Sequence, residues 1–299
     1  MTRNLAKVAA FIRIVASIIL ALALVVLGSP AIAGQSEQGP CGVQRAALYQ
    51  VQQQISVHNA EPHVFVVPEE LVAAELYDVE AAQLDSAQSQ AVSSLQTCEE
   101  TLEVLADEGP NSLPLKTQAS EKLRDALDSA KAKIPSGWKP STDPASSGRW
   151  EVPRSSPARA VYDLLRKDTP GKSFGEPDLQ GKPRPQVGDP DPAYLGKSIL
   201  GRRSDPTNPA VTADHIVPIA ELVNLPGFME LSADNMYMVS RAPINYQWLS
   251  WKANLAKSSR DVDEMTGIDP AWQADQVALQ SSVRAQMEKV IQQLIVSQH

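Results

Sequence analysis

The sequence predicts an α+β protein that is mostly helical. Apolar residues recur every three or four positions over residues 41–58, 68–105 and 270–296, which is the spacing of amphipathic helices. Two short runs, at 211–213 and 244–251, are predicted to be strands. We therefore expect an N-terminal helical hairpin or bundle. A C-terminal domain should follow, with two strands, a helix after the second strand and a long final helix.

The first 33 residues are predicted to be a secretory signal peptide. Three basic residues lie within the first 13 positions, residues 14–27 are apolar, and small residues precede Gly34. The apolar run is 14 residues long, which is shorter than the ~20 residues that a membrane span needs. Cleavage after Ala33 is therefore favoured over an uncleaved anchor. We expect a protein that is secreted, periplasmic or held in the cell envelope, without a stable membrane anchor.

Two cysteines lie on the apolar stripes of the first two predicted helices. Because an exported chain meets an oxidising compartment, Cys41 and Cys98 are expected to form a disulfide, worth about 4 kcal/mol by the chain-entropy model. His58 ends the first stripe and is interpreted as a packing residue, and His63 as a turn residue, since isolated histidines rarely bind metal.

The chain is expected to divide into a helical module at 34–135, a linker at 136–158 and a second domain at 159–299. A third helix is predicted over 115–133, after which proline, serine and glycine dominate the linker. The module is interpreted as a small helical bundle without chemistry of its own, with a possible protein partner. The second domain opens with a short predicted helix at 159–167 and continues with a loop rich in proline and glycine.

Charge is unevenly distributed along the chain. Residues 35–158 hold nine Lys and Arg against 18 Asp and Glu, whereas residues 159–260 hold 13 against 11. The chain as a whole has a formal charge of −8 and a pI of about 5.1, which argues against a protein that coats DNA non-specifically. A local basic cleft in the second domain remains compatible with this composition.

The candidate chemistry begins at a short strand that leads into Asp214-His215-Ile216-Val217-Pro218. A neutral imidazole at His215 can accept a proton from water near neutral pH. Asp214 points to the opposite side of an extended strand, so it suits a hard cation better than it suits orienting the histidine.

Three more polar residues follow in the second predicted strand and the helix after it. Asn245 begins the strand, where its amide could hold the loop that carries His215. Asn254 and Lys257 are three positions apart and share one face of the helix, so a metal ligand and a phosphate contact would lie together.

This pattern, Asp-His-x-x-Pro followed by Asn-x8-Asn-x2-Lys, resembles that of the HNH endonucleases. The resemblance covers roughly residues 195–262 and includes an insert around 225–232 like that of secreted bacterial toxins. It implies a ββα-metal fold, with His215 as the general base, Asp214 and Asn254 as ligands of one divalent ion, and Asn245 positioning the base. The ion would be Mg²⁺, with Mn²⁺ or another divalent ion as alternatives.

The resemblance also leaves choices open. A shifted alignment would pair Asn235 with Asn245, although only the first alignment places Lys257 in register. Where many family members carry zinc-knuckle cysteines, this chain has Ser250 and Ala253, so no structural zinc is expected. Besides Lys257, the candidate phosphate contacts are Arg203, with its neighbour Arg202, and Arg241.

The function that follows is an exported endonuclease that hydrolyses DNA with little sequence specificity. RNA is the alternative substrate, since nothing in the sequence reads a 2′ hydroxyl. The second alternative is a non-enzymatic helical interaction protein with a degenerate nuclease domain. Each motif residue also has an ordinary structural interpretation: Asn245 as a turn residue, Asn254 as a helix cap and His215 as a core histidine.

Overall fold

The computed structural model describes residues 40–298, apart from 67, 108 and 168–174. The predicted signal peptide at 1–33 lies outside the described residues. Those described belong to one compact unit. The unit is mostly helical and has two separate two-stranded antiparallel sheets in its described part, so the α+β class is confirmed.

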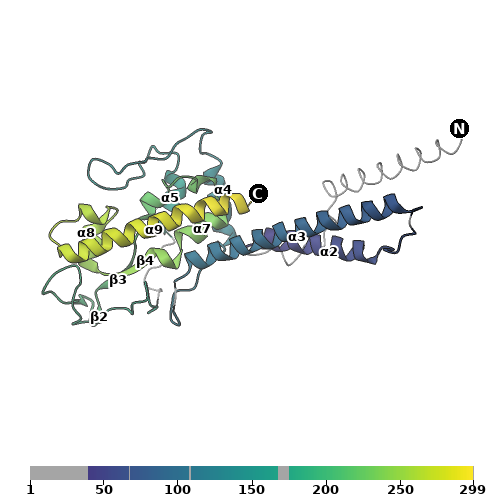
Figure 1. Ribbon diagram of the computed structural model, residues 1–299. Coiled ribbons are helices and arrows are strands. Elements are labelled where there is room, and N and C mark those ends of the chain that lie inside the picture. The colour runs from purple at the N-terminus through teal and green to yellow at the C-terminus, as the bar shows by residue number, and fades with distance from the viewer. Residues whose placement is uncertain (1–39, 67, 108, 168–174, 299) are drawn as a thin grey trace. The chain divides into compact units, whose positions relative to one another are not determined.

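The N-terminal helices form the predicted hairpin. Helix α2 spans Gly42–Ala60 and helix α3 spans Leu71–Leu105, and Figure 1 shows them side by side. The disulfide between Cys41 and Cys98 is present, with the two Cα atoms 5.8 Å apart. Near the end of α3, Leu105 is fully buried in the main hydrophobic core, so the second helix of the hairpin continues into the rest of the unit.

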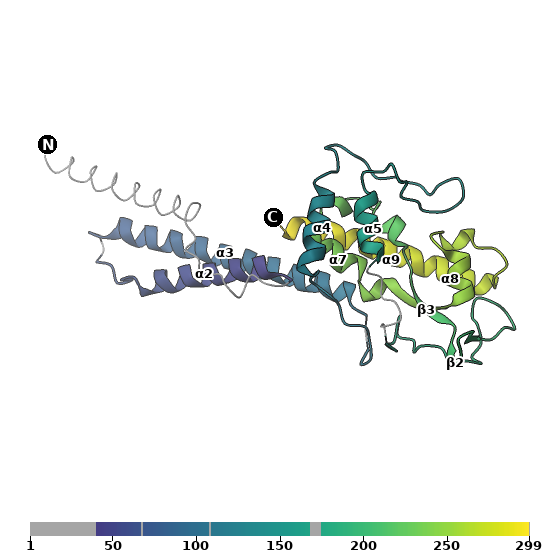
Figure 2. The ribbon, with the colours of Figure 1, turned by 180° about the vertical axis from the view of Figure 1, so that it is seen from behind.

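Several further helices pack around that core. Figure 2 shows helices α4 (Glu121–Lys131), α5 (Arg159–Lys167), α7 (Ala233–Ser240) and α9 (Pro270–Ser297) in the same part of the molecule. All four contribute buried apolar side chains to the core. Helix α9 begins at Pro270 because Asp269 caps it, accepting hydrogen bonds from the backbone of Ala271 and Trp272.

Two regions differ from the sequence-based expectation. Helix α4 begins six residues later than predicted, because Ser120 caps its first turn and accepts a hydrogen bond from the backbone N–H of Leu123. The segment expected to be a linker places Trp150 and Val152 in the main core, at 8% and 5% exposure. Its composition is typical of a linker, but these two apolar residues pack in the core with the helices.

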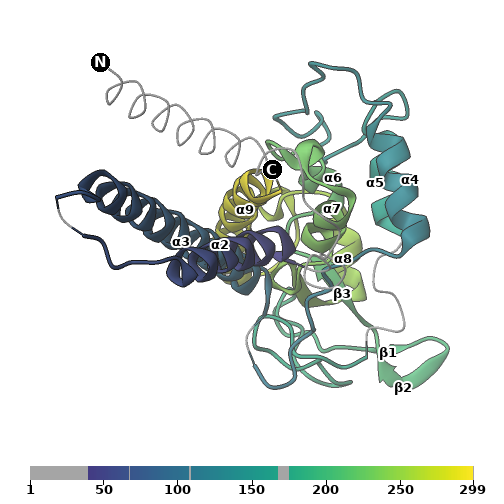
Figure 3. The same ribbon diagram turned by 90° about the vertical axis from the view of Figure 1, so that its right-hand side faces the viewer.

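The C-terminal half carries both sheets. Strands β1 (Gly201–Arg202) and β2 (Asp205–Pro209) form one hairpin, which Figure 3 shows at the edge of the molecule. Strands β3 (Val211–His215) and β4 (Tyr246–Ser250) form the other sheet, in which Asp214 lies opposite Gln247 and His215 opposite Tyr246.

The second sheet is followed directly by a helix. Helix α8 (Trp251–Lys257) begins after β4, where Ser250 accepts a hydrogen bond from the backbone of Ala253. The insert between β3 and β4 contains α6 (Ile219–Leu222), η1 (Phe228–Glu230), α7 and η2 (Pro243–Asn245). A short turn of helix, η3 (Val262–Glu264), connects α8 to α9.

None of the helices among the described residues combines the length and the apolar character that crossing a bilayer requires.

Candidate active site

His215 ends strand β3 and is held from two sides. Its ring lies 4.4 Å from the ring of Tyr246, its partner across the sheet, and Nε2 lies 3.2 Å from the carbonyl oxygen of Ser240 at the end of α7. A carbonyl can only accept a hydrogen bond, so Nε2 must carry the proton when this contact forms. The lone pair of the neutral ring is then on Nδ1, which is the atom able to accept a proton from another group.

The surroundings of His215 keep the imidazole neutral. Burial lowers its pKa from 6.5 to about 3, and the positive charges of Arg241 and Lys257 act in the same direction, while the Ser240 carbonyl opposes them. The ring is therefore uncharged at neutral pH, as a general base must be. A negatively charged ligand beside it would raise this pKa and strengthen the base.

Asp214 and Lys257 form a buried ion pair next to the backbone of His215. Lys257 Nζ lies 2.9 Å from Asp214 Oδ2 and 2.5 Å from the carbonyl oxygen of His215, and the lysine is 1% exposed. Burial raises the pKa of Asp214, and the charge of Lys257 opposes that rise. Lys257 thus connects helix α8 to the end of β3 from inside the protein, and offers almost no surface to a phosphate.

Asn245 holds the loop that follows His215. Its side-chain oxygen accepts a hydrogen bond from Val217 N–H at 2.7 Å, and its amide donates one to the Val217 carbonyl at 3.0 Å. The side chain is fully buried, so both bonds are shielded from water. Asn235, the alternative from the shifted alignment, instead contacts Gln298 at the end of α9.

Three of the sequence-predicted site residues come together in one cleft of about 770 Å³. Asp214, His215 and Asn254 all line it. Asp214 on β3 offers a carboxylate oxygen, and Asn254 on α8 offers an amide oxygen. Both are donor types that a hard divalent cation prefers. Lys257 takes one oxygen of the carboxylate, so the donor set fits a cation that keeps most of its ligands as water or phosphate, as Mg²⁺ does.

Another part of the cleft lining, here called the basic wall, comes from segments that the sequence analysis did not single out. Arg149 and Trp150 line it from the expected linker, and Arg159, Tyr162 and Arg166 line it from α5. The three arginines outnumber the two acidic residues in the lining, Glu151 and Asp214.

The residues on α5 form a stripe along one face of the helix. The guanidinium carbons of Arg159 and Arg166 lie 5.3 Å and 5.9 Å from the centre of the Tyr162 ring. Arg159 is also held by Asp163 and by the carbonyl of Val152, and its pKa is raised, mainly by the hydrogen bond to Asp163. The spacing Arg-x2-Tyr-x3-Arg on an amphipathic helix is the signal in the sequence that could have revealed this wall.

One backbone and one side-chain hydrogen bond of Trp150 hold the linker segment against the residues that follow α8. The Trp150 N–H donates to the carbonyl of Ser259 at 2.9 Å, and its indole N–H lies 3.2 Å from Asp261. These contacts span more than 100 residues of sequence, so they explain why the part of the basic wall at Arg149 and Trp150 could not be predicted from local patterns.

The other predicted phosphate contacts, Arg202, Arg203 and Arg241, lie outside the cleft lining. Arg241 is 4% exposed and donates to the carbonyl of Leu165, so it joins α7 to α5 and acts on His215 through its charge. Arg203 is exposed in the turn between β1 and β2.

Comparison with known proteins gave no match, whether to family models, to curated proteins or to solved structures.

Proposed function

We propose that the protein is an exported, metal-dependent endonuclease that hydrolyses DNA phosphodiester bonds with little sequence preference. The observation that carries the proposal is the position of His215. A neutral imidazole with its acceptor nitrogen free of the Ser240 contact lines the same cleft as Asp214, Asn254 and an arginine-bearing wall. The order β3, insert, β4, α8 is also the order that the resemblance to HNH endonucleases implies.

In the proposed mechanism, His215 accepts a proton from the attacking water through Nδ1. The Ser240 carbonyl fixes the tautomer, and Asn245 holds the loop behind the ring, so the base is oriented before substrate arrives. A divalent cation held by Asp214 and Asn254 would supply positive charge for the phosphate and for the leaving 3′ oxygen.

The basic wall accounts for the substrate class. Arginines read the phosphate backbone and carry no sequence information, and Tyr162 offers an aromatic face between two of them. This combination favours a polyanionic chain over a small phosphate ester. The near-neutral balance of residues 159–260 fits a basic surface confined to this cleft.

The test is nicking of supercoiled plasmid by the chain from Gly34 onward, with Mg²⁺, Mn²⁺ or EDTA. We expect cleavage with metal only, and a loss of at least ~100-fold in His215→Ala, which is the range for removal of a general base. His63→Ala is the matched control, because this histidine is exposed and lies outside the cleft lining.

Each other outcome has a distinct meaning. Cleavage that persists in His215→Ala would contradict its role as base. Cleavage of RNA but not of DNA would show that the substrate is RNA. Absence of cleavage with every metal and both nucleic acids would contradict the proposal and favour the helical interaction protein.

A further inference from the structure

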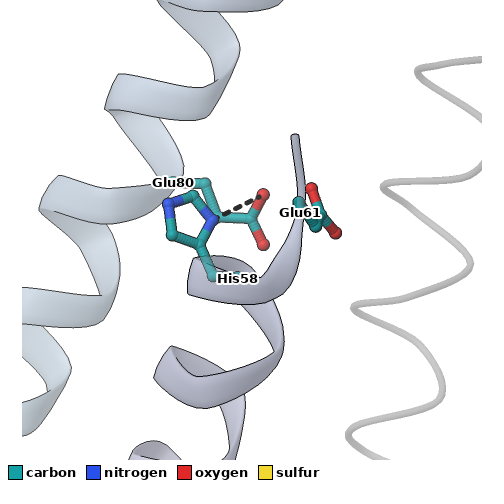
Figure 4. Close-up of side chains that lie close together, drawn as sticks. All are labelled: His58, Glu61 and Glu80. Atoms are coloured by element: carbon teal, nitrogen blue, oxygen red, sulfur yellow. Dashed lines mark ion pairs between the residues drawn. The ribbon is translucent and has the colours of Figure 1, made fainter. Parts of the chain in front are cut away.

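The hairpin contains a cluster of metal-ligand side chains that is separate from the cleft. His58 near the end of α2, Glu61 directly after that helix and Glu80 on α3 each bring one ligand atom to within 4.8 Å of the others (Figure 4). His58 Nδ1 lies 3.7 Å from Glu80 Oε2. A zinc ion with ligand distances of about 2.0–2.2 Å places neighbouring ligand atoms roughly 3.4 Å apart, so this pair is already near the required spacing.

Apart from the Glu80 carboxylate, the ring of His58 has no polar partner among the described residues, although the side chain is buried. His58 is 4% exposed, and neither ring nitrogen makes a hydrogen bond to any described residue. A buried imidazole without hydrogen bonds is costly, because both nitrogens give up contacts to water. The carboxylate of Glu80 faces Nδ1, and a cation between them would satisfy both groups.

The ring is also held in place. Tyr77 stacks on it with ring centres 4.0 Å apart and an angle of 25° between the planes, and Tyr77 lies one helical turn before Glu80 on α3. Glu61 and Glu80 are exposed, so their carboxylates can turn toward a cation with little rearrangement. The donors are thus one rigid imidazole and two adjustable carboxylates.

We propose that His58, Glu61 and Glu80 bind a Zn²⁺ ion that closes the hairpin at the end remote from its disulfide. Imidazole with carboxylates suits zinc, whereas Mg²⁺ prefers oxygen ligands and water. The site lies 17 residues from Cys41 on α2 and 18 residues from Cys98 on α3, about 25 Å along each helix. The hairpin would then be crosslinked at both ends, with one coordination position left for water.

The test is a zinc titration by calorimetry on the chain from Gly34 onward, comparing the wild type with Glu61→Gln/Glu80→Gln. We expect the wild type to bind one more equivalent of Zn²⁺ than the double variant. Its melting temperature should also rise with zinc more than that of the variant, because a ligand that binds only the folded state stabilises it. Glu75→Gln is the matched control, an exposed glutamate on the same helix but outside the cluster.

Equal zinc stoichiometry and equal melting shifts in wild type and double variant would overturn the proposal. If the double variant fails to fold, Glu61→Gln alone replaces it, since this residue is exposed and its loss should weaken zinc binding by more than about tenfold. Plasmid nicking should be unchanged in these variants, so failure of the zinc site and failure of the proposed nuclease are distinguishable.

Discussion

At the scale of single residues, Lys257 shows how burial changes the interpretation of a charged side chain. The sequence places it on the same helix face as Asn254, which suggested a phosphate contact. The structure buries it against Asp214 and the carbonyl of His215. A helix pattern tells which residues share a side but not whether that side faces water, so this outcome could not be predicted from spacing alone.

Replacement of Lys257 by methionine should therefore destabilise the fold. The change leaves the Asp214 carboxylate buried without its partner, which costs about 3–4 kcal/mol in free energy of unfolding. Urea unfolding measures the effect, with the exposed Lys197→Met as control. A variant of normal stability that binds DNA less tightly would instead support the phosphate contact.

The pKa of His215 predicts a dependence of stability on pH. The unfolded chain takes up a proton at this residue near pH 6.5, whereas the folded chain does so only near pH 3. The contribution of the neutral ring to the free energy of unfolding is therefore complete above about pH 6.5. It is lost as the pH falls toward 3.

Urea unfolding between pH 7 and pH 4 measures this loss. His215→Gln should reduce the slope of the free energy of unfolding by up to about 1.4 kcal/mol per pH unit in that window. An unchanged slope would mean that the imidazole titrates normally in the folded protein.

At the scale of elements, the amphipathic helices were the most predictable part of the fold. Helix α5 has the predicted bounds and α9 nearly so, because each packs one apolar face on the core. The two strands of the β3–β4 sheet were predicted from β-prone runs, and the helix after them was predicted separately. The start of α4 was predicted too early, because its apolar rhythm continues upstream of the Ser120 cap.

The stripe on α5 makes a prediction about DNA binding. Arg166 lines the cleft and is exposed, so Arg166→Ala should reduce the salt dependence of binding by about one unit in the log–log slope. Fluorescence anisotropy with a DNA duplex in EDTA measures binding without cleavage.

Arg203→Ala is the comparison for this experiment, since Arg203 is also exposed but lies outside the cleft lining. Its slope should match the wild type. The reverse result, with Arg203 affecting the slope and Arg166 not, would favour the contact suggested by the sequence.

At the scale of the whole compact unit, the hairpin and the cleft lining are formed by different parts of the sequence. Every cleft-lining residue lies after residue 148, whereas the disulfide joins residues 41 and 98. Cys41→Ser/Cys98→Ser should lower the free energy of unfolding by up to about 4 kcal/mol. Nicking at 25 °C should keep its wild-type rate as long as the chain stays folded, and a slower rate in a folded variant would show that the hairpin contributes to the site.

The candidate site was predictable where its residues belong to the motif and not where they lie outside it. Asp214, His215 and Asn254 were expected to lie together because the motif places them in two paired strands and the helix that follows, and all three line the cleft. Arg149 reaches the same cleft only through contacts between Trp150 and residues more than 100 positions later. No pattern within the segment around Trp150 or within the segment at 259–261 predicts that these two segments are in contact.

The joining of Trp150 to Ser259 and Asp261 has a consequence for protein engineering. A fragment cut at the apparent domain boundary near residue 159 would keep the motif but lose Arg149, Trp150 and Val152, and with them part of one cleft wall and part of the core. The transplantable module is therefore larger than the motif. A chimera should also keep Leu105, which lies in the same core at the end of α3, so only the part of the hairpin before it can be exchanged.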